Sequence, residues 1–458
     1  MNELIKNQEL LLSIKRIGIN GEGIGYYKKL AVFVKNALPG EECVVKITKV
    51  YDKYSEAELV RIKKNPSKDR IIPACPYYEK CGGCQLQHIN YEAGLKYKKD
   101  IVMESFKRYF NSELNPKIFK DTIGMAKPYG YRNKAKHPVR YDGEKLVTGL
   151  YGDKSNILIY IDECIIEKED IRETLKNICH VLTKNEVIAY HPKSKEGVLR
   201  HIVVRSSSFT GKLQVTLILY KKDKRTIDIA KKLIGIPNVE SIYVSINSNP
   251  DSLENFGEEI FKVSGSDTIT EKLGKYEFEL LPNSFFQLNL KQTEVLYDNI
   301  VKYAKFDGTE RVLDAYSGVG TIGLWISEYV KEVRGIDNNE AAIINANANV
   351  KRNNVLNASY YSGDILKLLE KFKKENWVPD VLVVDPPRMG IDIRLLNYLQ
   401  KNPVKKIIYV SCNPATLAKN CDHLSREYHI LAVQCLDMFP QTADVECVTV
   451  LVNKHLNK

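Results

Sequence analysis

Cys412 is the residue of this sequence that most directly suggests a reaction. It lies in residues 407–420, IIYVSCNPATLAKN. The apolar run before it predicts a strand, and Pro414 predicts the start of a helix, because its missing N–H costs no hydrogen bond at the first helical position. Cys412 is then expected at the carboxyl end of a strand, where ligands bind in open α/β sheets. A thiol there is either a packing residue or a nucleophile.

A cysteine cluster is the second candidate site. Cys75, Cys81 and Cys84 follow the pattern C-x5-C-x2-C, and two glycines allow the tight turn between the last two. Ten cysteines without an export signal favour metal or catalytic use over a disulfide framework. The best fourth ligand is Cys164 in IDECII, with Cys179 as second choice. Zinc and an iron–sulfur cluster both accept four thiolates, and the spacing does not separate them.

A glycine-rich turn is the third candidate site. Asp314 precedes Gly318, Gly320 and Gly323 in D-x3-G-x-G-x-x-G, a pattern of strand, turn and helix. The glycine motif alone indicates any adenosine-containing cofactor. The preceding acid favours S-adenosylmethionine over a dinucleotide, whose pyrophosphate would need the turn's N–H groups. Asp337, which ends the strand VRGID, is expected to accept hydrogen bonds from ribose hydroxyls.

A rigid loop follows the strand VLVVD. It consists of Asp385, two prolines and Arg388, and should face the cofactor crevice. Methyltransferases that act on amino groups carry an aromatic residue where this chain has Arg388, which argues against that chemistry.

The remaining chain must position these groups, and its length predicts about three domains. Residues 1–65 read as an OB-like β-barrel, residues 66–280 as an α+β domain with the cysteine site, and residues 281–458 as a Rossmann-like α/β domain. A helix is expected over about 91–111, where it packs on the catalytic domain. In residues 141–280, strands are expected at 146–152, 157–162, 201–208, 212–220 and 241–247, and helices at 169–184 and 226–236.

Charge is concentrated in the first third of the chain. Residues 1–140 hold 27 Lys and Arg against 15 Asp and Glu, within a net charge of +11. This charge either forms a solvated basic surface or binds a polyanion, of which a nucleic acid is the commonest. Residues 130–140, GYRNKAKHPVR, add cations among tyrosines, which suits contact with RNA backbone and bases, with a solvated strand face as the alternative. No membrane span or secretory segment is expected, so the predicted location is cytoplasmic.

These motifs together resemble the RNA 5-methyluridine methyltransferase family. Residues 21–41 resemble a TRAM domain, and the catalytic-domain matches are LPNSFFQLN (281–289), LDAYSGVGTIGL (313–324), RGID (334–337), VVDPPRMG (383–390), VSCNPATLAKN (410–420) and MFPQTADVECV (438–448). The N-terminal barrel and the cysteine cluster together resemble the branch of this family that modifies 23S ribosomal RNA. The resemblance implies a 4Fe–4S cluster on the four cysteines Cys75, Cys81, Cys84 and Cys164. It also implies S-adenosylmethionine contacts from Gln287, Tyr316, Asp337 and Asp385.

The resemblance also implies a mechanism. Carbon 5 of uracil is a poor nucleophile, so a thiolate, here Cys412, first adds to carbon 6. Glu446 matches the base that later removes the carbon-5 proton. Family members often have His two residues earlier, where this chain has Asp444, and Arg388 is a candidate to stabilise charge on the uracil. The target base is expected to leave its stack.

Two other functions compete with uracil methylation. A cytosine-5 methyltransferase uses the same addition but usually places its cysteine after proline, whereas Ser411 precedes Cys412 here. A non-catalytic RNA-binding or assembly protein is the third reading. We expect a monomer that binds RNA, and neither DNA nor membrane.

Overall fold

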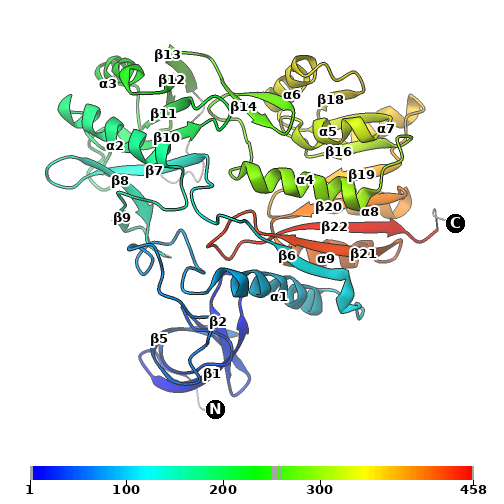
Figure 1. Cartoon of the computed structure of the whole chain (residues 1–458), viewed down its shortest axis with the longest axis horizontal. Coiled ribbons are helices and arrows are strands. Elements are labelled where there is room, and N and C mark those ends of the chain that lie inside the picture. The colour runs from blue at the N-terminus through cyan, green and yellow to red at the C-terminus, as the bar shows by residue number, and fades with distance from the viewer. Residues whose placement is uncertain (1–3, 154, 250–255, 258, 456–458) are drawn as a thin grey trace. The chain divides into compact units, whose positions relative to one another are not determined.

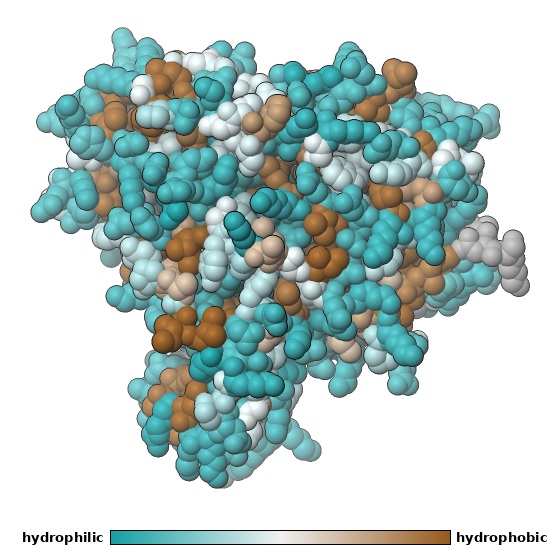
Figure 2. Space-filling model, viewed as in Figure 1, coloured by the Kyte–Doolittle hydropathy of each residue, from teal (hydrophilic) through white to brown (hydrophobic). Residues whose placement is uncertain are grey.

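A computed structural model describes residues 4–153, 155–249, 256–257 and 259–455 of the chain. The chain forms two compact units. Unit 1 comprises residues 1–126 and 386–458, and unit 2 comprises residues 127–385. No helix of the described residues is long and apolar enough to cross a membrane. Figure 2 shows hydrophilic side chains over most of the visible face, with hydrophobic residues in small groups.

Unit 1 begins with a small closed β-barrel (Figure 1), which confirms the barrel predicted for the N-terminal segment. Its strands are β1 (Glu9–Ile17), β2 (Gly23–Tyr27), β3 (Leu30–Val34), β4 (Glu42–Val50) and β5 (Tyr54–Lys64). The strand β2 contains Gly23 and Gly25, although glycine is uncommon within strands. They are needed there, since a Cβ on Gly23 would lie 2.4 Å from the carbonyl oxygen of Ala37.

The rest of unit 1 combines one long helix with a four-stranded region of sheet. Asn90 caps the helix α1 (Tyr91–Tyr109), which agrees with the predicted helix and packs against α9 (Pro414–Leu424). The strands run in the order β20-β22-β21-β6, and β22 pairs antiparallel with both β20 and β21. Their bounds, with those of the remaining helix, are β6 (Phe119–Ile123), β20 (Lys406–Ser411), β21 (Tyr428–Leu436), β22 (Glu446–Asn453) and α8 (Ile393–Lys401).

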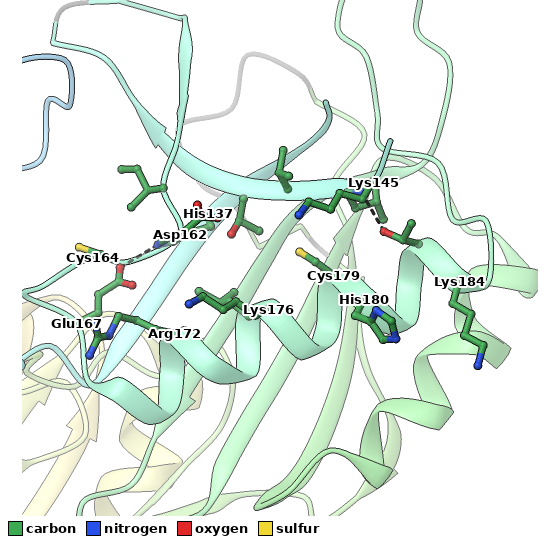
Figure 3. Close-up of a pocket in the computed structure, with 16 residues that line it drawn as sticks. His137, Lys145, Asp162, Cys164, Glu167, Arg172, Lys176, Cys179, His180 and Lys184 are labelled. Atoms are coloured by element: carbon green, nitrogen blue, oxygen red, sulfur yellow. Dashed lines mark hydrogen bonds and ion pairs between the residues drawn. The ribbon is translucent and has the colours of Figure 1, made fainter. Parts of the chain in front are cut away.

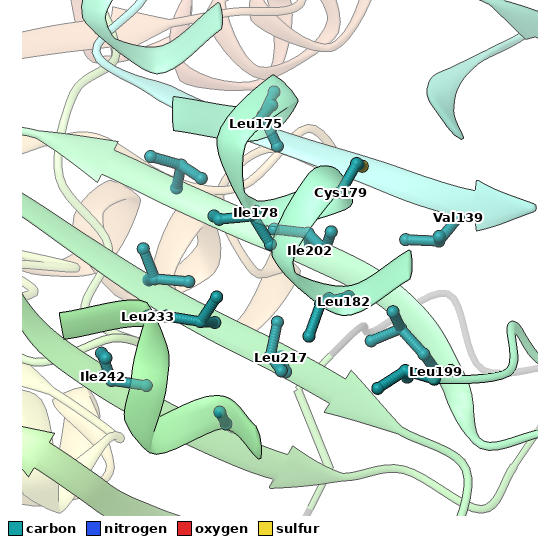
Figure 4. Packing of buried hydrophobic residues seen from close by; sticks show 14 of the residues in the cluster. Val139, Leu175, Ile178, Cys179, Leu182, Leu199, Ile202, Leu217, Leu233 and Ile242 are labelled. Carbon is teal, nitrogen blue, oxygen red and sulfur yellow. The ribbon is translucent and has the colours of Figure 1, made fainter. Parts of the chain in front are cut away.

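A seven-stranded mixed sheet forms the first part of unit 2, in the order β13-β12-β11-β10-β7-β8-β9. The helices α2 (Glu169–Lys184) and α3 (Lys224–Ala230) lie over it, and Figure 4 shows Ile178 and Leu182 of α2 among residues of the strands. The strands are β7 (Lys134–Tyr141), β8 (Leu146–Tyr151), β9 (Leu158–Tyr160), β10 (Leu199–Ser206), β11 (Leu213–Leu219), β12 (Val239–Ile246) and β13 (Glu259–Gly265).

Most predictions for this sheet agree with the structure, but β7 was expected only as an alternative. The basic and aromatic segment that contains β7 is a strand within the sheet, and its His137 and Val139 are buried. Part of this segment therefore forms core, while Lys136 on the same strand remains exposed.

Unit 2 ends in parallel strands joined by helices, the arrangement predicted for a cofactor-binding domain. The strands run in the order β18-β17-β16-β19, and all three pairings are parallel. A hairpin and a helix precede them. The elements are β14 (Ile269–Leu273), β15 (Tyr276–Leu280), α4 (Leu290–Ala304), β16 (Arg311–Ala315), α5 (Thr321–Ile326), β17 (Glu332–Asp337), α6 (Glu340–Arg352), β18 (Ala358–Ser362), α7 (Ile365–Lys374) and β19 (Val381–Val384).

Candidate active site

The glycine-rich turn between β16 and α5 has a left-handed backbone at three residues. Gly318 and Gly320 have φ angles of 54° and 84°, in a region that glycine enters at little cost. Tyr316 has a φ of 63° in the same region, which is strained for a bulky residue. Tyr360 closes the turn from behind, because its hydroxyl donates to the carbonyl oxygen of Gly320 at 3.0 Å. A Cβ on Gly335 would lie 2.1 Å from the ring of Tyr360, so this glycine lets the ring pack under the turn.

Three carboxylates meet where β16, β17 and β19 end. Asp314 is fully buried, and one of its oxygens accepts the backbone N–H of Gly323 at 2.9 Å. Burial raises the pKa of Asp314 to about 8, and the charges of Asp385 and Asp337 add to that rise. Burial also raises the pKa of Asp385 to about 7. Near neutral pH Asp314 is therefore mostly protonated and Asp385 partly so, and their carboxyl groups can form hydrogen bonds with a ligand.

Asp337 holds the glycine turn in place while remaining an acceptor. Its two oxygens accept backbone N–H groups from Gly318 at 3.0 Å and from Asn339 at 2.8 Å. Each carboxylate oxygen has a second lone pair, so donors such as ribose hydroxyls still fit. Gln287, in the loop before α4, is half-buried. Tyr316 belongs to the turn itself, so Tyr316, Asp337 and Asp385 lie on adjacent strand ends of one unit.

Cys412 and Glu446 lie at neighbouring strand ends in unit 1. The antiparallel register of β20 and β22 ends with Ser411 opposite Cys447, so Cys412 and Glu446 are each one residue away from this last pair. Cys412 is half-buried, and Glu446 has 7% of its surface exposed. The nucleophile and the base predicted from separate motifs thus lie at adjoining strand ends.

Asn413 joins the thiol-bearing turn to the loop that contains Arg388. Its side-chain oxygen caps α9 by accepting the N–H groups of Ala415 and Thr416, at 3.1 and 3.4 Å. Its side-chain nitrogen donates to the carbonyl oxygen of Arg388 at 3.1 Å, and the Thr416 hydroxyl donates to the same oxygen at 3.2 Å. The SCNPAT motif therefore connects the turn that carries Cys412 to the proline-rich loop.

Comparison with known proteins identifies the family of this chain. Residues 90–455 match the family model for tRNA (uracil-5-)-methyltransferase, and residues 4–60 match the TRAM domain. The chain belongs to the tRNA (uracil-5-)-methyltransferase family. It is accordingly an S-adenosylmethionine-dependent RNA methyltransferase, as its chemistry and its relatives both indicate.

The relatives span the full length of the chain. An uncharacterized RNA methyltransferase of Bacillus cereus is 44% identical over 455 residues, covering 99% of this chain and 98% of that protein. An uncharacterized RNA methyltransferase of Listeria innocua is 42% identical over 453 residues, covering 98% of this chain and 99% of that protein. Among solved structures, the Pyrococcus abyssi tRNA (uracil-54, C5)-methyltransferase in complex with S-adenosyl-L-homocysteine is 29% identical to this chain, with a TM-score of 0.74. The similarity covers 96% of this chain and 99% of that one. The predicted family and methyl donor are thereby confirmed.

Asp444, at the position where the family resemblance led us to expect His, forms an ion pair. One of its oxygens lies 2.8 Å from a guanidinium nitrogen of Arg388. Both side chains are largely exposed, so the pair adds little stability by itself. It does connect the proline-rich loop to the segment that leads into Glu446, which a neutral His would do more weakly.

A buried lysine of α1 supports the same segment, and the sequence motifs did not reveal it. Lys98 is 2% exposed, and its ammonium donates to a carboxylate oxygen of Asp437 at 2.5 Å and to the carbonyl oxygens of Phe439 and Asp444 at 3.2 and 2.7 Å. The Tyr91 hydroxyl donates to the other Asp437 oxygen at 2.7 Å. The one signal in the sequence was a lysine placed within the apolar stripe of the predicted helix.

The cysteines of C-x5-C-x2-C lie in an irregular segment of unit 1, and Cys164 lies in unit 2. All four are half-buried, and the backbone N–H of Gly83 donates to the Cys81 sulfur at 3.3 Å. None of the ten cysteines, all within the described ranges, forms a disulfide bond. No three His, Cys, Asp or Glu side chains of the described residues are grouped as metal ligands. The cluster therefore remains a prediction, although polarised soft sulfur donors suit iron or zinc.

The cysteine segment contacts the segment that precedes Glu446. The backbone N–H groups of Gln85 and Leu86 donate to the carbonyl oxygen of Gln441 at 3.1 and 3.0 Å. The Gln85 side chain accepts the N–H of Ala443 at 3.2 Å. A group bound at Cys84 would thus be one residue away from contacts with the catalytic segment.

Proposed function

We propose that this enzyme transfers a methyl group from S-adenosylmethionine to carbon 5 of a uridine in 23S ribosomal RNA through a covalent adduct with Cys412. The observation that supports the proposal is the register of β20 and β22, in which Cys412 and Glu446 are each one residue away from the paired Ser411 and Cys447. A packing cysteine would gain nothing from a carboxylate neighbour, whereas this reaction needs both groups.

In the proposed reaction the thiolate first adds to the uracil and is later released from it. The Cys412 sulfur bonds to carbon 6 of the uracil, and the electron pair of the 5,6 double bond makes carbon 5 nucleophilic. S-adenosylmethionine, when bound, supplies the electrophilic methyl group that carbon 5 takes. Glu446 then accepts the proton from carbon 5, the double bond re-forms, and the carbon–sulfur bond breaks to release the thiolate. Arg388, paired with Asp444, is proposed to stabilise the negative charge that develops on the uracil oxygen.

Trapping the adduct tests the roles of the two residues separately. RNA containing 5-fluorouridine has no proton at carbon 5 for Glu446 to accept, so wild-type enzyme should form a complex that survives denaturing electrophoresis. Cys412→Ala should form none. Glu446→Gln should form an adduct with ordinary uridine RNA and release it slowly. A Cys412→Ala variant that retains full methyl transfer would refute the nucleophile assignment.

Gln287, Tyr316, Asp337 and Asp385 are proposed to hold the methyl donor. The support is that three of them lie on adjacent strand ends around a glycine turn, and that Asp337 has lone pairs for ribose hydroxyls. Asp337→Ala should raise the Kd for S-adenosylmethionine by about tenfold or more, since it removes hydrogen bonds to a charged acceptor. Calorimetric titration of both proteins measures this, and an unchanged Kd would remove Asp337 from the site.

A 4Fe–4S cluster on Cys75, Cys81, Cys84 and Cys164 is the proposed metal centre, with zinc as the alternative. The support is the spacing of the first three cysteines, their partial exposure and the N–H donation to Cys81. Protein purified without oxygen should contain about four iron and four sulfide per chain. A colourless preparation with one zinc would overturn the iron assignment.

The proposed RNA target is ribosomal, although the matched family and the solved Pyrococcus relative are named for tRNA. The barrel, the cysteine pattern and the basic first third of the chain support it. Mapping 5-methyluridine in 23S and transfer RNA from cells with and without the gene decides the target. Label found in 5-methylcytidine would favour the cytosine reading, and loss of ribosome assembly without loss of methylation would favour a non-catalytic role. We also propose a cytoplasmic monomer.

A further inference from the structure

The N-terminal barrel contacts the segment that leads into Glu446, and it does so through the turn between β1 and β2. Gly21 lies in this turn, is buried and has a φ of 86°. A Cβ on Gly21 would lie 2.9 Å from Cβ of Gln85 and 3.2 Å from Cδ2 of Leu86. It would also lie 3.4 Å from Cβ of Ala443. The barrel turn therefore packs against both the cysteine segment and the chain shortly before the proposed base.

Gln85 links the barrel turn to the segment before the base. Its backbone N–H donates to the carbonyl oxygen of Gln441 at 3.1 Å, and its side-chain oxygen accepts the N–H of Ala443 at 3.2 Å. Its side-chain nitrogen donates to the carbonyl oxygen of Gly82 at 2.8 Å. Because both polar atoms of the side chain are bonded, a displacement of Gln85 by the turn would be passed on to Gln441 and Ala443.

The backbone at Gln441 depends on such support. Gln441 has a φ of 72°, in the left-handed region that residues with a Cβ seldom adopt. Such a conformation costs free energy and persists where the surroundings hold it. The carbonyl oxygen of Gln441 accepts the N–H groups of both Gln85 and Leu86. Gln441 and Ala443 are also buried, with exposed fractions of 6% and 5%. Packing against other segments therefore helps to set the path of the backbone to the base.

The barrel is fastened to the chain that follows it, so its turn is a firm support. Glu41 of the barrel is fully buried, and its carboxylate accepts the N–H of Ser67 at 3.1 Å and two guanidinium N–H groups of Arg70 at 3.0 and 2.8 Å. The N–H of Ile71 then donates to the carbonyl oxygen of His88 at 3.0 Å. The barrel thus holds the chain before the cysteines through an ion pair and the chain after them through its turn.

We propose that the barrel turn positions the catalytic base Glu446. Gly21 packs against Gln85 and Ala443, and these two residues hold the backbone that leads to the base. The inference rests on the proposed role of Glu446 and extends it, because it assigns part of the rate of turnover to the N-terminal barrel. Gly21 acts through its neighbours, so it is a positioning residue.

Alanine at Gly21 tests the contact, and alanine at Gly40 is its matched control. Gly40 belongs to the same barrel and has a φ of 89°, but a Cβ there meets no atom of the described residues within 4 Å. Both variants place a side chain on a left-handed backbone, whereas only Gly21→Ala must move Gln85, by about 0.5 Å to restore ordinary contact.

The two glycine variants should differ in turnover and agree in binding. We expect the kcat of Gly21→Ala to be about tenfold below that of Gly40→Ala, because small displacements of a catalytic group are costly. Their Kd values for S-adenosylmethionine and for RNA should agree within about twofold, since Gly21 is buried and the proposed donor site lies in unit 2.

Covalent trapping shows which step the contact serves. RNA with 5-fluorouridine has no carbon-5 proton for Glu446 to accept, so both glycine variants should form its adduct at the same rate. With ordinary uridine RNA, Gly21→Ala should accumulate the adduct, as Glu446→Gln does, and Gly40→Ala should not. If circular dichroism shows Gly21→Ala to be unfolded, Ala443→Gly loosens the same contact without straining the barrel and should accumulate the adduct in its place.

A lower kcat could also come from loss of the proposed metal centre, because Gln85 directly follows Cys84. Cys164, the fourth proposed ligand, lies beside a cavity in unit 2 that α2 helps to line (Figure 3). Cys164→Ser removes this ligand and leaves the barrel turn unchanged, so it shows what loss of metal alone does to kcat. Gly21→Ala should retain the metal content of Gly40→Ala while its kcat falls.

Several outcomes would overturn the inference and leave the proposed reaction standing. They are equal kcat values for the two glycine variants, an effect of Gly21→Ala confined to the KM for RNA, a loss of metal like that of Cys164→Ser, and slower trapping with 5-fluorouridine RNA. Glu446→Gln tests the proposed reaction separately. Full turnover by Glu446→Gln would remove the base from the mechanism, and the role of the barrel turn with it.

Discussion

Replacing Lys98 with methionine should damage both stability and turnover. Methionine has a similar length and fits the apolar surroundings of α1, so the change removes the ammonium with little loss of packing. It leaves the buried carboxylate of Asp437 without its ion-pair partner and two carbonyl oxygens without a donor. Breaking a buried ion pair from one side costs about 3–5 kcal/mol.

Turnover should fall because the same ammonium holds the backbone at Asp444, two residues before Glu446. A displacement of about 1 Å at a catalytic group can cost about 100-fold in rate. We expect kcat to fall by about 10- to 100-fold, with the KM for S-adenosylmethionine within about twofold, because unit 2 carries the proposed donor site and is unaltered. Methyl transfer from labelled donor to cellular RNA measures both constants.

Lys96→Met is the matched control, since Lys96 is exposed on the same helix. Chemical unfolding monitored by circular dichroism compares the two variants, and the double variant Lys98→Met, Asp437→Asn should recover part of the loss by removing the stranded charge. If Lys98→Met unfolds with the same midpoint as Lys96→Met and retains its kcat, the buried pair does not position the catalytic segment.

Three further changes test other parts of the site. Asn413→Ala removes the cap of α9, worth about 1 kcal/mol, and the bond to the carbonyl of Arg388, so kcat should fall while binding of the methyl donor is retained; an unchanged kcat would contradict the role of this cap. The raised pKa of Asp314, about 8 against an ordinary 3.8, means that the folded protein keeps a proton that the unfolded chain releases, so this group lowers stability as pH rises from about 4 to 8. Asp314→Asn should therefore flatten the pH dependence of the unfolding midpoint between pH 5.5 and 7.5, and an unaltered profile would show that Asp314 titrates normally. Cys84→Ser should prevent binding of the proposed iron–sulfur cluster and also lower kcat, because Gln85 and Leu86 bond to Gln441; loss of iron with full activity would show that the cluster does not support turnover.

The sequence was most informative where a local pattern determines the structure. The barrel, α1, α2 and the parallel strands follow from apolar periodicity and turn residues, and the strand–turn–helix around Cys412 follows from Pro414. The strand β2 and the core position of β7 did not, because glycines and charged residues there serve packing that depends on distant segments. That Cys412 and Glu446 lie at adjoining strand ends did not follow from local patterns, since the antiparallel register between β20 and β22 is a long-range property.

The segment before Glu446 is held from three directions, and of the residues that hold it only Arg388 belongs to a motif recognised in the sequence. Lys98 reaches it from α1, Gln85 and Leu86 from the cysteine segment, and Arg388 from the proline-rich loop. The supports from α1 and from the cysteine segment use backbone carbonyl groups, whereas the support from Arg388 uses the side chain of Asp444. This explains how Asp444 can stand where relatives often have His: the position needs an acceptor for Arg388, and a carboxylate supplies it with a charge. Asp444→His should then keep most of the activity at pH 7, whereas Asp444→Lys, which repels Arg388, should not, and equal activities would show that the pair is dispensable.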